Sequence, residues 1–338
     1  MKKLINDPFD FVEESLEGFL LAHADTVKRV GKRAVGRKDG LTPGKVGVVV
    51  GGGSGHLPAF AGYVGKGGAD AAPIGNIFAS PPAKPVLEAT HAANGGAGVL
   101  YSYGNYAGDV MNFDRAAAQA AEQGVPVETV LVTDDAASAP KEEQTQRRGI
   151  AGDFFVFKVA AAKAETMADL VAVKAAAVLA NNNTRTMGVA LSACTVPANG
   201  KPTFSLPEGE LEISLGIHDE PGLRRTKVEP VDKLVDEMTD YILKDLDLSG
   251  SDVAVLINGL GATPYEELYI MYRKLSQILD AQRVGIKRSY VGEYVTSLEM
   301  ARASITLLRL NDELLELIDA PAYCPMFLQN RAMLRGRI

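Results

Sequence analysis

The pattern of apolar and polar positions in the first half of the chain alternates between short apolar runs and longer amphipathic stretches. Apolar, β-branched runs predict buried strands at residues 46–50, 98–103 and 127–133. An Ala-rich helix is expected at 115–123, and an acidic amphipathic segment at 9–21 precedes all of these elements. Strands that alternate with helices in this way are typical of an α/β layer with a parallel sheet.

The second half of the chain has the same kind of pattern. Apolar runs predict strands at 187–195, 252–259 and 305–310, the last of which is expected to close a second sheet. Residues 211–218 alternate as in a half-exposed strand, and amphipathic helices are expected at 231–246 and 265–282. The fold class is therefore α/β, with two α/β domains and mainly parallel or mixed sheets.

A domain boundary is expected near the middle of the chain. The helical pattern over residues 167–180 ends in three consecutive asparagines, 181–183, and asparagine favours the end of a helix. At 338 residues the chain is about twice the size of a typical single domain. We therefore predict domains at 1–183 and 184–338, with only the charged segment 141–148 outside the folded parts.

Charge, cysteine content and the N-terminal sequence narrow the class of protein. Lys and Arg number 35 against 42 Asp and Glu, and a net charge of -7 repels phosphate backbones, so nucleic acid is not an expected partner. Cys194 and Cys324 have neither a CxxC nor a metal-ligand spacing, which indicates reduced thiols. The N-terminus lacks the apolar stretch of a signal peptide, and no apolar run approaches the ~18 residues of a membrane span. We expect a soluble, cytoplasmic protein without a membrane partner.

The sequence GGGSGH, residues 51–56, follows the first strand and has three interpretations. Glycine-rich turns after a strand often bind phosphate, because glycine lets a ligand approach the backbone closely. A dinucleotide site is a second interpretation, but its third glycine is missing, and no GxxxxGK[ST] sequence occurs anywhere. The third interpretation is a structural turn with His56 as a buried hydrogen-bonding side chain.

Four histidines occur, and two of them follow apolar strands. His23 and His91 lie on predicted helices, where we expect solvent-facing or structural roles. His56 and His218 each begin a loop that contains Gly or Pro, and Asp109 lies in a glycine-containing loop after another core strand. Ligands collect at the carboxyl ends of strands in α/β sheets, so these last three side chains are candidates for a functional site.

Two histidines and one aspartate could bind a metal, form a nucleophilic site or merely line a loop. Zinc is disfavoured, and no metal site is predicted, because no HExxH sequence, acidic cluster or cysteine lies near either histidine. A hydrolase nucleophile would need a GxSxG sequence, and Ser54 has the wrong spacing. The remaining option is an imidazole that acts on the substrate itself, as a base or as a nucleophile.

Distinctive motifs are distributed over most of the chain. They are GGGSGH (51–56), IFASP (77–81), GNYAGDVMNF (104–113), RRGIAG (147–152), ACTVPANGKPTF (193–204), GIHDEPG (216–222), LGATP (260–264) and SITLLRLNDELLELIDAP (304–321). Together they resemble the dihydroxyacetone-binding subunit of the dihydroxyacetone kinases. The resemblance runs from the N-terminus to about residue 325 and is highly specific for that family.

The resemblance implies two α/β domains with the active site at their interface, the substrate lying in the first domain and a covalent histidine coming from the second. His218 resembles the histidine that forms a covalent hemiaminal with the carbonyl carbon of the substrate. His56 and Asp109 look like the pair that hydrogen-bonds the substrate and assists removal of a proton from the hydroxyl to be phosphorylated. The other substrate-binding residues that the resemblance implies are Gly53, Ser54, Gly55, Ser80 and Gly104.

The resemblance also implies partners. In the family's single-chain kinases a separate all-helical domain holds ATP, so we expect no cofactor on this chain, and ATP or ADP with Mg on a helical partner subunit. Phosphoryl transfer is mostly positioning and charge stabilisation, and half of that machinery would lie in the partner. A phosphotransferase-system phosphodonor protein is a further candidate partner, and a homodimer is expected. The expected substrate is a short keto-sugar, dihydroxyacetone or a four-carbon relative such as erythrulose.

Three positions depart from the family pattern. Leu57 and Asn76 each stand where the family usually has Glu, and Gly104 stands where it usually has Lys. Two carboxylates and one cation are thus missing together, which keeps the local charge nearly balanced. We interpret this as a reshaped pocket or partner surface in a protein that retains its three candidate catalytic side chains.

Two other classes of function are weighed against the kinase. A ligand-sensing paralogue would bind the ketone covalently but activate a transcription regulator, and it would need only His218. The presence of Asp109 therefore favours the kinase. A nicotinamide-dependent oxidoreductase is disfavoured by the failed glycine fingerprint. We predict a kinase subunit that is active only with its partner.

Overall fold

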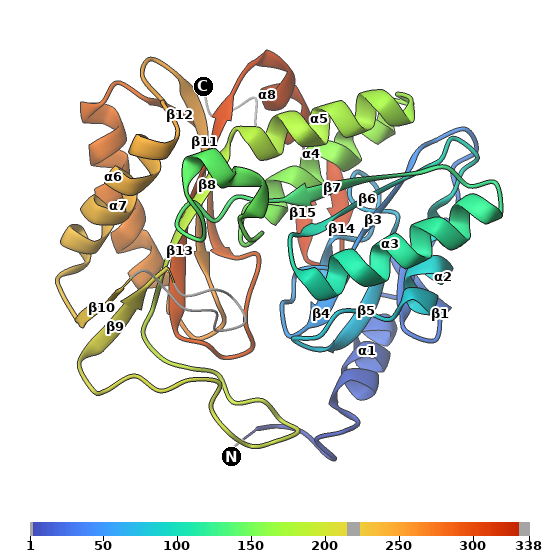
Figure 1. The fold of residues 1–338 in the computed structure, drawn as a ribbon, viewed down its shortest axis with the longest axis horizontal. Helices are drawn as coiled ribbons and strands as arrows, with labels where there is room; N and C mark the ends of the chain where they lie inside the picture. Colours follow the sequence, from blue (N-terminus) through green and yellow to red (C-terminus); the bar gives the residue numbers. More distant parts are fainter. Residues whose placement is uncertain (1–2, 215–223, 331–338) are drawn as a thin grey trace. The chain divides into compact units, whose positions relative to one another are not determined.

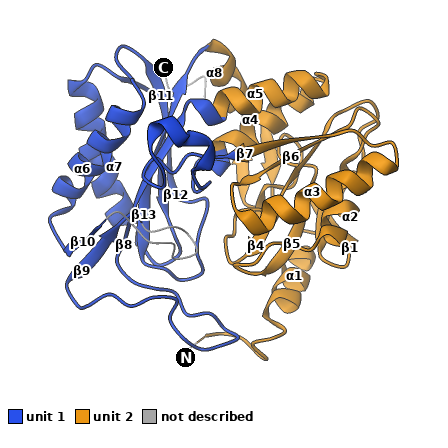
Figure 2. Ribbon diagram, in the orientation of Figure 1, with its two compact units in different colours: residues 1, 132–154, 181–311 blue, residues 2–131, 155–180, 312–338 orange. Residues whose placement is uncertain are grey.

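The structure is a computed structural model that describes residues 3–214 and 224–330. These residues form two compact units, each assembled from separate stretches of the chain (Figure 2). Of the described residues, unit 1 contains 132–154, 181–214 and 224–311, and unit 2 contains 3–131, 155–180 and 312–330.

The chain passes between the two units at several points. The boundary expected between residues 183 and 184 lies beside the passage at 180–181. Further passages occur at 131–132, 154–155 and 311–312. The two units are therefore not continuous halves of the chain.

Unit 2 is built on a seven-stranded sheet in the order β1-β2-β5-β3-β6-β7, with β4 paired to β5. All of these strands except β2 are labelled in Figure 1. Its strands are β1 (Val27–Gly31), β2 (Ala34–Arg37), β3 (Gly47–Val50), β4 (Gly52–Ser54), β5 (Ala71–Ile77), β6 (Val99–Gly104) and β7 (Val127–Val132). β5, β3 and β6 are parallel neighbours, whereas β1, β2 and β5 pair antiparallel, so the sheet is mixed. The strands expected at 46–50, 98–103 and 127–133 are confirmed.

The remaining elements of unit 2 are mostly helical. They are α1 (Phe11–Ala22), η1 (Ala61–Tyr63), α2 (Ala83–Ala93), α3 (Ala107–Glu122), most of α4 (Asp153–Glu165) and α5 (Leu170–Asn182), α8 (Asp312–Asp319), and the hairpin of β14 (Ala322–Cys324) and β15 (Phe327–Gln329). Helices α2 and α3 cover the sheet through a shared core, in which Val86 and Phe113 pack with Val49 and Tyr101. α4 is buried around most of its circumference, as expected for an apolar helix surrounded by protein.

A buried ionic network joins β2, the segment before β5 and α4 within unit 2. Arg37 lies 3.0 Å from Asp70 and 2.7 Å from Glu165, and Nζ of Lys45 lies 2.6 Å from Asp70. Burial lowers the pKa of the Lys45 ammonium, although the Asp70 carboxylate acts in the opposite direction. Because each buried charge has an opposite partner, the network orients these elements without leaving a lone charge in the core.

Unit 1 is built on a six-stranded sheet in the order β10-β9-β8-β13-β11-β12. Its strands are β8 (Thr184–Ala190), β9 (Glu210–Ile213), β10 (Arg224–Lys227), β11 (Asp252–Gly259), β12 (Gly285–Glu293) and β13 (Arg302–Leu310). Only β11 and β12 pair in parallel among the neighbours with a described register. The strand expected at 305–310 is confirmed as part of β13, which lies in the interior of the sheet between β8 and β11.

Helices α6 (Val231–Asp245) and α7 (Tyr265–Ala281) pack on the sheet of unit 1, as the amphipathic patterns predicted. Their apolar faces meet the strands in one core, to which α6 contributes Met238 and Ile242 and α7 contributes Leu268 and Leu275. None of the helices in the described ranges combines the length and apolar composition needed to cross a bilayer.

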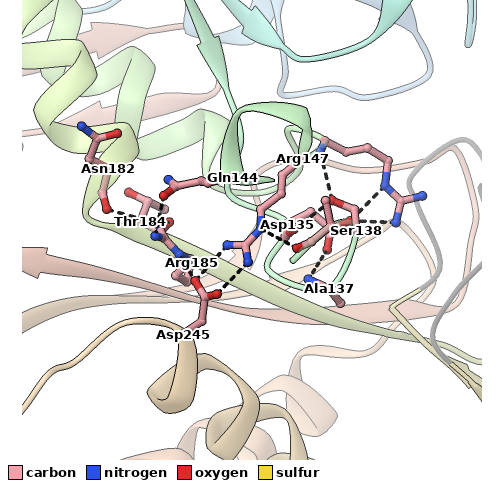
Figure 3. Close-up of polar contacts among 11 residues, drawn as sticks. Asp135, Ala137, Ser138, Gln144, Arg147, Asn182, Thr184, Arg185 and Asp245 are labelled. Carbon is pink, nitrogen blue, oxygen red and sulfur yellow. Dashed lines mark hydrogen bonds and ion pairs between the residues drawn. The ribbon is translucent and has the colours of Figure 1, made fainter. Parts of the chain in front are cut away.

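The charged segment 141–148 is folded as part of unit 1, with Arg147 buried, so the expectation that it lies outside the folded parts is wrong. Residues Lys141–Gln146 form the 3-10 helix η2, and Arg147 after it is 1% exposed. Both Nη atoms of Arg147 donate to the carboxylate of Asp245, at 2.8 and 2.6 Å. Arg185 Nε donates to the same carboxylate, and its Nη2 donates to Gln144 (Figure 3).

Candidate functional site

The glycine segment after β3 is held against the segment that follows β5. β4 lies in this glycine segment and pairs with β5 in parallel. A Cβ atom on Gly53 would lie 2.7 Å from the backbone nitrogen of Ala79 and 3.0 Å from the backbone of Phe78, so only glycine allows this approach. Gly55 has φ +105°, a conformation that side chains disfavour. The IFASP segment and the GGGSGH segment therefore form one structural unit.

Replacement of Gly53 by alanine is expected to separate these two segments and to lower the free energy of unfolding by about 1–3 kcal/mol, because the new methyl group meets backbone rather than a movable side chain. Thermal denaturation measures the change. Gly108→Ala is the control, since a Cβ there meets only the Ser80 side chain at 3.5 Å, an ordinary contact. Equal melting temperatures for the two variants would contradict the prediction.

His56 lies at the end of the glycine segment and is 1% exposed. Its ring is 5.3 Å from the ring of Phe78 and 6.4 Å from that of Phe60, centroid to centroid. Phe78 has φ +52°, a left-handed conformation that is costly for an aromatic residue. Strain of this kind persists only where the surroundings impose it, and here it brings the aromatic ring to His56.

Asp109 lies in the first turn of α3, not in a loop as the sequence pattern predicted. The partial positive charge of a helix N-terminus favours a carboxylate at this position. Asp109 is 8% exposed. Burial raises the pKa of the nearby Tyr103 phenol, and the carboxylates of Asp114 and Asp109 raise it further. Tyr103 stacks on Phe113 with ring centroids 4.2 Å apart, which fixes α3 against the end of β6.

Ser80 connects the IFASP segment to α3. Nδ2 of Asn112 donates to the Ser80 hydroxyl at 3.2 Å, and Gly108 lies against the same side chain. Together with the contacts of Gly53 and Phe78, this places the glycine segment, IFASP and the start of α3 side by side within unit 2. These three segments carry all the predicted substrate-binding residues, with Gly104 buried at the end of β6 just before α3.

The structure gives other predicted residues structural roles or leaves them outside the site. The hydroxyl of Ser54 donates to the carbonyl oxygen of Gly75 at 2.7 Å, so it stabilises the pairing of the glycine segment with β5. His23 ends α1 and lies 4.9 Å from the Phe19 ring, and His91 is exposed on α2, in agreement with the structural or solvent-facing roles expected for them. His218 lies outside the described residues.

The three positions that depart from the family pattern have different environments. The side chain of Leu57 is 41% exposed. Asn76 is also exposed, and its Oδ1 accepts a hydrogen bond from Nη1 of Arg33. Gly104 is buried. Only Gly104 therefore lies in the interior, at the strand end that precedes Asp109.

The RRGIAG motif surrounds a buried carboxylate in unit 1 that the sequence analysis did not single out. Asp134 is fully buried and accepts hydrogen bonds from the backbone N–H groups of Ile150 and Gly152, at 2.8 and 2.7 Å. A Cβ on Gly152 would lie 2.5 Å from this carboxylate, so any residue other than glycine at position 152 would clash with Asp134. Burial raises the pKa of Asp134 to about 6, although these hydrogen bonds act in the opposite direction.

Two further features of the described residues bear on the site. No three His, Cys, Asp or Glu side chains gather closely enough in the ranges 3–214 and 224–330 to hold a metal ion. A cavity of about 690 Å³ in unit 2 lies beside the β14–β15 hairpin, where it is lined by Glu165, Tyr323 and Leu328. None of the predicted site residues lines that cavity, so it is separate from the candidate site.

Comparison with known proteins identifies the class to which this fold and site belong. The family model of the Dak1 domain matches residues 17–326, and the chain therefore belongs to the Dak1 domain family. This confirms the resemblance that the motifs indicated, and with it the two-part α/β fold class.

Named relatives within this family are kinases or kinase subunits. The chain is 50% identical to the dihydroxyacetone-binding subunit of PTS-dependent dihydroxyacetone kinase 2 from Listeria innocua, over 97% of this chain and 99% of that protein. It is 46% identical to the L-erythrulose kinase of Pectobacterium atrosepticum, over 97% of this chain but only 56% of that enzyme. The chain thus spans the whole of one relative and about half of the other.

Solved structures show the same fold. The dihydroxyacetone kinase of C. freundii in complex with AMP-PNP and Mg²⁺ matches with a TM-score of 0.88 and 33% identity, over 97% of this chain and 61% of that one. The dihydroxyacetone kinase operon co-activator matches with a TM-score of 0.87 and 28% identity, over 94% and 98% of the two chains. A kinase and a co-activator therefore share this fold, and only site chemistry can separate the two activities.

Proposed function

We propose that this chain is the substrate-binding subunit of a kinase that phosphorylates a short keto-sugar with the help of a separate nucleotide-binding subunit. The observation that carries the proposal is the 50% identity to a dihydroxyacetone-binding kinase subunit, which extends over 97% of this chain and 99% of that protein.

In the proposed mechanism the ketose is anchored by His218. A neutral imidazole uses the lone pair of one ring nitrogen to form a bond to the carbonyl carbon, and the π electron pair of the C=O bond moves to the oxygen. That oxygen gains a proton while the other ring nitrogen loses one, so a hemiaminal forms with no loss of water. Glycerol has no carbonyl carbon, so this step rejects it despite its similar hydroxyl groups.

His56 and Asp109 would act on the hydroxyl group that receives the phosphoryl group. Both side chains belong to the segments that pack together in unit 2, and both are buried. In a buried site a carboxylate or an imidazole can accept the hydroxyl proton as the oxygen attacks phosphorus. The partner subunit would supply ATP, or ADP rephosphorylated by a phosphotransferase-system protein, with Mg²⁺ to neutralise the phosphate charges.

Reconstitution tests this proposal. The chain alone, its cognate nucleotide-binding subunit alone, and the two together are incubated with dihydroxyacetone or erythrulose and the phosphodonor, and the phosphorylated ketose is measured. We expect turnover only in the combined sample. Retained ketose without turnover, together with binding to a transcription regulator, would instead support the co-activator function, which the likeness to the operon co-activator keeps as the second candidate.

The reconstituted enzyme is expected to prefer a four-carbon keto-sugar to dihydroxyacetone by at least about tenfold in kcat/KM. Gly104 lacks the long side chain that the resemblance makes usual at this position, and it lies just before α3, so we expect an additional hydroxymethyl group to fit beside Asp109. Side-by-side kinetics with dihydroxyacetone and both erythrulose enantiomers measure the ratio. Leu57→Glu is the control, because Leu57 is exposed, and it is expected to leave the ratio unchanged. A preference of the wild-type enzyme for dihydroxyacetone would contradict the prediction.

A further inference from the structure

The backbone of Ser80 in unit 2 is held on both sides of the residue. A Cβ atom on Gly75 would overlap the carbonyl oxygen of Ala79 and lie 2.8 Å from the backbone nitrogen of Pro81, so the segment that contains Ser80 packs directly against β5. Proline also restricts the residue before it to extended backbone conformations. The freedom that remains to Ser80 is therefore the rotation of its side chain.

Within the described ranges, one side chain forms a hydrogen bond with the Ser80 hydroxyl group. Nδ2 of Asn112 on α3 donates to Oγ at 3.2 Å, so the hydroxyl proton points away from the amide. That proton is directed at the carbonyl oxygen of Pro81 at 3.4 Å, beyond the usual range of about 2.5–3.0 Å for an O–H···O hydrogen bond. The hydroxyl group is thus a weakly used donor that a closer oxygen atom can engage.

Asn112 has a fixed direction and no second hydrogen-bonding partner. The bond to Ser80 is the only one that its side chain forms with residues 3–214 and 224–330. Asn112 follows Asp109 by three residues, so the two side chains are neighbours on the surface of α3. The next residue, Phe113, is buried against Tyr103 and fixes the rotation of α3 about its axis. The Asn112 amide therefore orients Ser80 without being needed to hold the helix.

Ser80 lies between the two segments of unit 2 that carry candidate catalytic side chains. The residue before it, Ala79, packs against the glycine segment that ends in His56. On α3, a Cβ atom on Gly108, the residue before Asp109, would lie 3.5 Å from Cβ of Ser80. The Ser80 hydroxyl group is therefore placed beside both segments.

We propose that Asn112 is a positioning residue for ketose binding, which holds the Ser80 hydroxyl group so that its proton is donated to an oxygen atom of the sugar. The proposal deepens the proposed function and rests on it, because it requires the ketose to lie beside His56 and Asp109. A short keto-sugar bears an oxygen atom on every carbon, so an acceptor is present at each position along it. Asn112 acts through Ser80 and does not contact the sugar.

A double-mutant cycle with Asn112→Ala and Ser80→Ala tests the proposal. Each single substitution is expected to weaken the binding of dihydroxyacetone and erythrulose to the chain by about three- to tenfold, the loss expected for one hydrogen bond between neutral groups. The double variant is expected to lose no more than Ser80→Ala alone, because Asn112 acts only through the hydroxyl group. Calorimetry measures the affinities. In the reconstituted kinase, KM is expected to rise by the same factor while kcat stays at the wild-type value.

Gln119→Ala is the matched control, because it removes an amide side chain from an exposed position on the same helix. It is expected to leave affinity and KM unchanged, and all of these variants are expected to keep the wild-type melting temperature. Additive losses in the double variant would overturn the positioning role, as would wild-type affinity in Asn112→Ala. A wild-type chain that gives no turnover with any ketose after reconstitution overturns the proposed function itself, so the two failures are distinguishable.

Discussion

Replacement of His218 by alanine is expected to abolish the covalent ketose adduct and to lower kcat/KM of the reconstituted kinase by at least about 100-fold. The physical reason is that the bond to His218 offsets the entropy cost of holding the ketose in one geometry toward the phosphoryl donor, and the alanine variant lacks this offset. Intact-mass spectrometry after incubation with ketose, followed by mapping of the peptide that contains residues 216–222, measures the adduct. A hemiaminal adds the full mass of the ketose, while a lysine Schiff base would lose one water.

His91→Ala is the control for this experiment, because His91 is exposed on α2 and lies outside the candidate site. It should retain both adduct and turnover. Glycerol is the second control and should give no adduct with the wild-type chain. An adduct of equal yield on the His218→Ala protein would show that another side chain forms the covalent bond.

Asp245→Asn is expected to lower the free energy of unfolding by about 3–5 kcal/mol, the cost of leaving a buried charge without its partner. The carboxylate of Asp245 receives both Nη atoms of Arg147 and Nε of Arg185, and its side chain is 8% exposed. The variant leaves two guanidinium groups close together in the core of unit 1. Urea denaturation followed by circular dichroism measures the change.

Asp240→Asn on the same helix provides the control for that prediction. Asp240 pairs with Lys244 at the surface, with exposures of 62% and 74%, and such pairs contribute less than about 1 kcal/mol. The two substitutions are chemically identical and differ only in burial. Similar losses of stability from Asp240→Asn and Asp245→Asn would show that the buried network contributes no more than a surface ion pair.

The Asp245 carboxylate also makes the stability of the protein sensitive to acid. Burial alone would raise the pKa of Asp245, but hydrogen bonds from Arg147 and Arg185 outweigh it and lower the pKa. A lowered pKa means that the stabilisation is present above the ordinary carboxyl pKa of about 4 and is lost as the pH falls below it. The difference in stability between wild type and Asp245→Asn is therefore expected to shrink below about pH 4.

Much of the fold could be predicted because its strands and helices have local patterns. The apolar run 252–259 coincides with β11, and the amphipathic helices at 231–246 and 265–282 end within one residue of α6 and α7. Strand order could not be predicted in this way. β13 lies inside its sheet because of pairings with β8 and β11, and no local pattern specifies which distant strand becomes a neighbour.

The motifs indicated the segments that pack together in unit 2, whereas local patterns missed the features that depend on long-range contacts. Segment 141–148 is charged and resembles a surface loop, yet Arg147 is buried by Asp245, 98 residues further along the chain. The start of α3 was interpreted as a loop because glycine and asparagine near residue 105 favour turns, whereas packing of Phe113 against Tyr101 and Tyr103 stabilises the helix. Ser54 remains a predicted substrate-binding residue, and no motif indicated that its hydroxyl donates to the carbonyl oxygen of Gly75.

The interleaved composition of the two units has a consequence for the order of biosynthesis. A ribosome releases most of unit 2 first, but α8 and the β14–β15 hairpin, which belong to it, are released after the whole of unit 1. Unit 2 therefore begins to form first and is completed last. Until α8 and the β14–β15 hairpin are synthesised, the surface of unit 2 against which they pack stays uncovered. Cutting the gene between codons 183 and 184 would leave residues 132–154 of unit 1 on the first fragment and residues 312–330 of unit 2 on the second. Folded protein is therefore expected from co-expression of the two fragments and not from either fragment alone.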